Sequence, residues 1–281
     1  MRILLTSVLL LAALPSAAAA TAARSQHAAI GHPTSPTRIV LRISSGGGFV
    51  APQTNLRALP SFTLYGDGTV IVPGVITQMY PGPAIYPLIR SKLRESQVQA
   101  LLRRAARAGL LVRGPIDYGT VGVSDMPTTT VLLNAGGRQL KRQAYALGAT
   151  GGTPLPARQA AARKALTRFI AGLPHGVSGA HYVPRALAVY VAPSDGQAQP
   201  GASEVVWPLR RNLATAGKHV PSGLDYRCIS VGGADATTLL ATLRNANEVS
   251  LWSMRAGPGK RYQLIARPLL PDERNCASLA A

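Results

Sequence analysis

Residues 61–72 read SFTLYGDGTVIV, and this stretch decides the fold class. Two runs of β-branched and aromatic residues flank Gly66-Asp67-Gly68, and glycine and aspartate tolerate the positive φ that a tight turn requires. The pattern therefore predicts a β-hairpin, and the turn is enough to explain Asp67. A second hairpin is predicted over residues 128–145, where TTTVLLN precedes Ala135-Gly136-Gly137.

Helices are expected on either side of the second hairpin. Residues 95–108 carry Val98, Leu101, Leu102 and Ala105 at helical spacing, and residues 157–173 carry a similar apolar stripe. Hairpins with a few helices, without regular βαβ alternation, indicate an α+β fold with mainly antiparallel sheets and helices packed on one face. Further strands are predicted at residues 38–43, 187–191, 227–231 and 261–268, and further helices at residues 208–216 and 235–247.

The chain divides into two halves of similar size at the segment PHGVSGAHYVP, which has no periodicity. The helical segments LLRRAARA (101–108) and LLATLRNA (239–246) can be aligned, so an internal duplication is a hypothesis. Segments rich in alanine and leucine also align by chance. The expected organisation is a signal peptide (1–20), a flexible leader (21–36), an N-terminal half (37–173), a linker (174–184) and a C-terminal half (185–281).

Four segments together resemble a group of bacterial secreted proteins of unknown function. The segments are PSFTLYGDGTVI (60–71), ESQVQALLRRAARAGLL (95–111), PTTTVLLNAGG (127–137) and RYQLIARPLLPDERNC (261–276). The shared pattern is a YGDG hairpin, a leucine-rich helix and a Thr-rich strand, and it covers most of residues 38–276. The resemblance implies an exported α+β protein and carries no activity with it. Arg94 departs from the pattern, since a small helix-capping residue is expected there.

The N-terminus has the features of a secretory signal peptide. Met1-Arg2 precedes an apolar stretch over residues 3–14, and Ala18 and Ala20 occupy the −3 and −1 positions of a cleavage site. A membrane anchor is the alternative, but a bilayer needs about 20 apolar residues and this stretch is shorter. We therefore expect a secreted or extracytoplasmic protein that begins at Thr21 after cleavage.

Export would place the two cysteines, Cys228 and Cys276, in an oxidising compartment. In an oxidising compartment a disulfide between them is the simplest prediction, and it would tie the C-terminal tail to the second half. A metal site is a weaker interpretation, because there is no second cysteine pair and no histidine at ligand spacing.

Common catalytic and cofactor motifs are absent from the sequence, including G-x-S-x-G, H-E-x-x-H, G-x-x-x-x-G-K-[ST], G-x-G-x-x-G and C-x-x-C. We therefore predict no catalytic residue, cofactor or metal. A secreted hydrolase remains an alternative, with a site near the loop that holds Asp117, Tyr118 and Asp125, although turn chemistry also explains those residues. The loop histidines His175, His181 and His219 match no usual metal spacing, and Trp207 and Trp252 are expected in the core.

The excess of basic over acidic residues is the feature of the sequence that says most about function. The chain has 30 Lys and Arg against 11 Asp and Glu, a formal net charge of +19. Unpaired like charges on a helix are destabilising, so an anionic partner would offset them. Candidate partners are anionic envelope polymers, membrane headgroups and extracellular nucleic acid. The candidate polyanion-binding residues are Arg103, Arg104, Arg107, Arg138, Lys141, Arg142, Arg163, Lys164 and Arg168.

Other interpretations stay open at this point. The charge could be compositional and serve only solubility, which its spread along the chain without a run of five or six favours. A protein-interaction role would require an exposed apolar patch, for example around residues 81–88. A single-stranded nucleic-acid platform is disfavoured, because aromatic residues make up only 5% of the chain and are not interleaved with the basic ones. Sequence-specific nucleic-acid binding is not expected either. The oligomeric state is not indicated.

Overall fold

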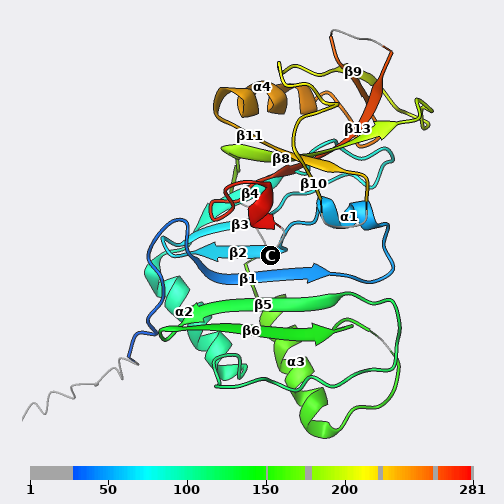
Figure 1. The fold of residues 1–281 in the computed structure, drawn as a ribbon. Helices are drawn as coiled ribbons and strands as arrows, with labels where there is room; N and C mark the ends of the chain where they lie inside the picture. The colour runs from blue at the N-terminus through cyan, green and yellow to red at the C-terminus, as the bar shows by residue number, and fades with distance from the viewer. Residues whose placement is uncertain (1–27, 150, 175–178, 221–223, 256–258, 280–281) are drawn as a thin grey trace, which may run out of the picture.

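The computed structural model describes residues 28–149, 151–174, 179–220, 224–255 and 259–279. They form two sheets that are mainly antiparallel, with helices packed against them, so the predicted α+β class is confirmed (Figure 1). The predicted signal peptide and residues 21–27 lie outside the described residues. None of the described helices is both long enough and apolar enough to cross a bilayer.

The first sheet has seven strands in the order β6-β5-β1-β2-β3-β4-β7. Both predicted hairpins are confirmed as β2–β3 and β5–β6. Gly68 has φ +83°, which is the left-handed conformation that the first hairpin turn requires. The strands are β1 (Ile39–Gly46), β2 (Phe62–Tyr65), β3 (Thr69–Pro73), β4 (Leu88–Lys92), β5 (Thr128–Ala135), β6 (Arg138–Tyr145) and β7 (Ala180–His181).

Two predicted helices, α2 (Glu95–Arg107) and α3 (Ala157–Ala171), cover one face of this sheet. Leu102 of α2 and Leu166 of α3 are fully buried in the same apolar cluster as the inward side chains of β1 and β5. Helix α2 begins as predicted although Arg94 gives no side-chain cap, because the backbone N–H of Arg94 donates to Oε1 of Gln97 at 2.8 Å.

The second sheet has six strands in the order β10-β11-β8-β13-β12-β9, and α4 (Gly233–Leu243) packs on one face of it. Trp207 and Trp252 are buried in this core as predicted, edge to face with ring centroids 6.2 Å apart. Strands β9 and β12 are parallel. The strands are β8 (Ala186–Ser194), β9 (Glu204–Val206), β10 (Lys218–His219), β11 (Arg227–Gly232), β12 (Leu251–Ser253) and β13 (Arg261–Pro268).

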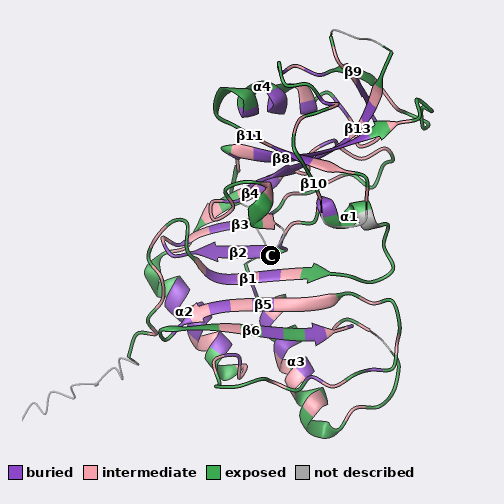
Figure 2. Cartoon of the chain, in the orientation of Figure 1, coloured by how far each residue is buried: buried purple, intermediate pink, exposed green. Residues whose placement is uncertain are grey.

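The helix layers α2–α3 and α4 lie at opposite ends of the molecule (Figures 1 and 2). The other faces of the two sheets carry separate apolar clusters at the junction between the halves. Leu270 belongs to a small apolar cluster on the first sheet, and its neighbour Leu269 belongs to one on the second. The cluster on the second sheet also includes residues of the short helix α1 (Pro52–Leu56) and of the C-terminal turn η1 (Cys276–Leu279).

The helix predicted at residues 208–216 is wrong. The segment follows a series of turns, and Trp207, Leu209 and Leu213 are buried in the second core. The indole N–H of Trp207 donates to the carbonyl of Arg211 at 2.9 Å, and Oδ1 of Asn212 accepts the N–H of Ala214 at 2.8 Å. These side-chain bonds offer the backbone an alternative to a helix.

The predicted leader and linker both contact the first half. Residues 28–36 contact both α2 and the first sheet: the N–H of Ile30 donates to Oε1 of Gln99 at 2.9 Å, and the carbonyl of Gly31 accepts the N–H of Gly136 at 2.7 Å. This part of the expected flexible leader is therefore packed against the fold. Within the predicted linker, β7 pairs with β4 and adds an edge strand to the first sheet. The two sheets differ in strand order, so a duplication is not shown.

Candidate functional site

Five predicted binding residues lie on the outward sides of α2 and α3. Arg103, Arg104 and Arg107 lie opposite the buried stripe of α2, and Lys164 and Arg168 lie opposite that of α3. The two helices are adjacent, since Nη2 of Arg104 donates to the carbonyl of Phe169 at 3.4 Å and its guanidinium lies 6.0 Å from the ring. We call these five residues the basic helical face.

Carboxylates do not neutralise this face in the part of the chain that the structure describes. Residues 95–173 contain eleven Lys and Arg but only three acids, and the described ion pairs of arginine lie elsewhere. Arg42 pairs with Asp272, and Arg57 with Glu248, both across the junction of the halves. These two acids join the halves, and the basic helical face keeps its positive charge.

Two of the predicted binding residues, Arg142 and Arg163, are buried. Arg142 donates to the carbonyls of Leu110, Val112 and Gly114, and Arg163 to those of Tyr118, Tyr145 and Ala146. Desolvation lowers the pKa of Arg163. Both guanidinium groups hold loops in place, so they are not included in the basic helical face.

The remaining two predicted residues lie at the edge of the first sheet, on β6. Arg138 is exposed and donates to the carbonyl of Leu111 at 3.4 Å, which places it near the end of α2. Lys141 is exposed and alternates with the buried Arg142, so it points to the opposite face of the sheet. The structure thus groups five of the nine residues closely and separates Lys141 from them.

The Asp117–Asp125 alternative finds no catalytic partner among the described residues. The carboxylate of Asp117 accepts bonds from the N–H of Gly119 and from Nε2 of Gln159, each at 2.8 Å, and these bonds lower its pKa. Asp125 has φ +59°, and its carbonyl accepts the N–H of Phe49 at 3.0 Å. The Gly119 bond is that of an ordinary turn, and the other two tie the loop to α3 and to residue 49.

Tyr118 in the same loop carries a buried hydroxyl without a hydrogen-bond partner in the described part of the chain. Burial also raises the pKa of this phenol. An unsatisfied buried hydroxyl costs stability, so Tyr118→Phe should leave the free energy of unfolding unchanged or raise it by up to about 1 kcal/mol. Urea unfolding of both proteins measures the difference, and a loss above about 1 kcal/mol would mean that the hydroxyl has a partner after all.

A cleft of about 990 Å³, lined by both polar and apolar groups, lies at the junction of the halves. One wall comes from the first half and includes Ser44, Ser45 and Asn55. The opposite wall comes from the second half and includes Arg211 and Lys218. Its size is at the upper end of the range for small-molecule sites. We call this cavity the junction cleft.

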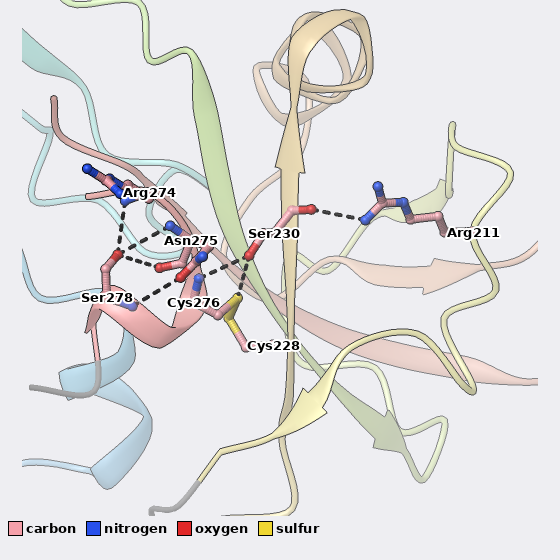
Figure 3. The surroundings of a disulfide bond; sticks show 7 residues. All are labelled: Arg211, Cys228, Ser230, Arg274, Asn275, Cys276 and Ser278. Atoms are coloured by element: carbon pink, nitrogen blue, oxygen red, sulfur yellow. Dashed lines mark hydrogen bonds between the residues drawn. A yellow bond between two sulfur atoms is a disulfide. The ribbon is translucent and has the colours of Figure 1, made fainter. Parts of the chain in front are cut away.

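The predicted disulfide between Cys228 and Cys276 is confirmed and forms part of the cleft wall, with the two Cα atoms 6.0 Å apart (Figure 3). It joins β11 to the C-terminal turn. The hydroxyl of Ser230 accepts the N–H of Cys276 at 3.0 Å, and the hydroxyl of Ser278 accepts the N–H of Arg274 at 3.0 Å. A disulfide of this kind is compatible with an extracytoplasmic protein.

Two ion pairs hold the residues just before the disulfide-bonded turn, Asp272 and Glu273. Glu273 accepts two bonds from Arg267, at 2.8 and 2.9 Å, and both side chains are buried. Asp272 accepts from Arg42 at 2.7 Å and from the hydroxyl of Tyr65 at 2.6 Å. Burial, followed by the charge of Asp272, raises the pKa of Tyr65 well above its usual range.

The apolar loop proposed as an interaction patch is docked on the second half. The carboxylate of Glu248 accepts bonds from the N–H of Gly82 at 2.8 Å and from Nη1 of Arg57 at 2.7 Å. An apolar groove of about 780 Å³ remains beside this loop, with the exposed Val75 and Val183 at its rim. Residues 81–88 are otherwise half-buried or buried.

The junction cleft was not predicted from the sequence, because its residues come from many distant segments of both halves and include no motif. The predicted disulfide was the one available signal, since it places Cys276 beside β11. The described residues contain no group of three side chains that could hold a metal ion, and His175 lies outside them. No family model, curated protein or solved structure matches the chain.

Proposed function

We propose that this protein is exported and binds an anionic envelope polysaccharide, without catalysis, through the basic helical face. The observation that carries the proposal is the grouping of Arg103, Arg104, Arg107, Lys164 and Arg168 on two adjacent helices without a described carboxylate partner. A polyanion would neutralise these charges and release its counterions. The disulfide supports action outside the cytoplasm.

Grouping on one helical layer favours binding over a purely compositional origin of the charge. Described carboxylates pair with Arg42, Arg57 and Arg267 at or near the junction of the halves, whereas none of them pairs with the five residues of the basic helical face. Membrane headgroups offer anionic charge too, but a polysaccharide fits a face that presents guanidinium groups with little exposed apolar surface.

The test is binding of the protein from residue 21 to fluorescent dextran sulfate over a salt series. The variant Arg103→Gln/Arg107→Gln/Lys164→Gln/Arg168→Gln should bind at least tenfold more weakly and show a shallower salt dependence, because four counterion-releasing contacts are lost. Vesicles of anionic phospholipid form a second arm, and preference for them over the polysaccharide would overturn the choice of partner.

The matched control is Arg90→Gln/Arg185→Gln/Arg244→Gln/Arg255→Gln, which removes the same charge from exposed positions elsewhere. We expect this control to retain most of the affinity. Equal weakening of both variants would show that binding follows net charge alone, and the basic helical face would then have no special role.

A further inference from the structure

We infer that the junction cleft is a second binding site, which takes a single sugar residue that carries an anionic group. The inference rests on the proposed function, since it names the chemical unit of the polymer that the protein would bind. It concerns other residues than the basic helical face, on the opposite side of the first sheet from α2 and α3.

The charge inside the cleft selects an anion. Arg42 and Arg267 line it, but their charges are balanced by Asp272 and Glu273. Arg211 uses Nη1 to donate to the carbonyl of Ser230 at 3.0 Å, and among the described residues it faces no carboxylate. Lys218 is exposed and likewise has no described partner. Two positive charges on one wall therefore remain for a ligand.

The opposite wall supplies neutral hydrogen-bonding groups. The hydroxyls of Ser44 and Ser45 and the amide of Asn55 line the cleft and have no described hydrogen-bond partner. Hydroxyl and amide groups both donate and accept, which is what sugar hydroxyls require. A cleft with cations on one wall and such groups on the other matches a sugar with a phosphate or carboxylate, better than it matches a bare anion.

One side of the site, the C-terminal turn, is held in place without a ligand. The disulfide holds the C-terminal turn that closes the cleft (Figure 3). The Arg267–Glu273 pair and the bonds of Asp272 hold the segment just before it. A site held in place by covalent and buried polar contacts loses little conformational freedom on binding. A cleft formed only by surface loops would lose more conformational freedom when a ligand binds.

The experiment is calorimetric titration of the protein with glucose 6-phosphate, glucuronate, glucose and inorganic phosphate. The first two distinguish phosphate from carboxylate as the anionic group. We expect at least one of them to bind at least tenfold more tightly than glucose and than inorganic phosphate. Failure of both to bind at millimolar concentration, or equal binding of inorganic phosphate, would overturn the inference.

Variants locate the site. Arg211→Gln/Lys218→Gln should weaken binding of the charged sugar at least tenfold, whereas Arg210→Gln/Lys260→Gln removes the same charge from exposed positions outside the cleft and should not. The variant of the basic helical face should lose dextran sulfate binding and keep the charged sugar. Charged-sugar binding that survives Arg211→Gln/Lys218→Gln would place the site elsewhere, without affecting the proposed function.

Discussion

Glu273→Gln should lower the free energy of unfolding by about 3–5 kcal/mol, because it leaves the buried guanidinium of Arg267 without a counter-charge. The side chains of Arg267 and Glu273 are only 8% and 7% exposed, so water cannot replace the lost partner. Oε2 of Glu273 also accepts the N–H of Leu270 at 2.8 Å. Denaturant unfolding at neutral pH measures the loss.

The matched control is Glu204→Gln, which breaks the same type of pair at the surface. Glu204 bonds Arg261 at 2.9 Å, but its side chain is 67% exposed. Exposed pairs contribute about 0–1 kcal/mol, so this variant should be nearly as stable as the wild type. If the two variants lost the same small amount, burial would not govern the strength of the Arg267–Glu273 pair.

A second variant separates the charge from the packing. Arg267→Met/Glu273→Leu removes both charges and keeps similar volume, so it should recover much of the stability that Glu273→Gln loses. Recovery will be incomplete, because Nε of Arg267 also donates to the carbonyl of Ala58 at 2.9 Å. A double variant as unstable as the single one would show that the bonds of Arg267 to Ala58 and of Glu273 to the N–H of Leu270 matter more than the charge pair.

The elements with strong local signals were predictable from the sequence. Glycines in the turns of the β2–β3 and β5–β6 hairpins and the apolar stripe of α2 each specify structure within a few residues. The short strands β9, β10 and β12 have no such signal, because pairing with distant strands creates them. The helix expected at 208–216 failed because Trp207 and Asn212 bond to the backbone locally.

The candidate sites were also predictable only where local sequence determines them. The basic helical face could be predicted, because helical spacing alone places Arg103, Arg104 and Arg107 on one side of α2. The burial of Arg142 and Arg163 could not be predicted, since it depends on carbonyls of loops that fold over them. The junction cleft needs the arrangement of both sheets, and no single segment carries that information.

Cys228→Ala/Cys276→Ala should lower the free energy of unfolding by up to about 4 kcal/mol, as expected when a cross-link over 48 residues no longer restricts the unfolded chain. Reductant should bring the wild type to the stability of the variant and should leave the variant unchanged. A variant as stable as the oxidised wild type would show that the cross-link contributes nothing.

A double-mutant cycle with Glu273→Gln tests where the disulfide acts. If it acts only on the unfolded chain, the two losses should add to within about 0.5 kcal/mol. If it also holds the C-terminal turn against the sheets, Glu273→Gln should cost less in the cysteine-free protein, because the turn can then move and expose Arg267 to water. Non-additive losses would support a cleft wall held jointly by the disulfide and the buried ion pair, and additive losses would mean that each holds its part of the turn alone.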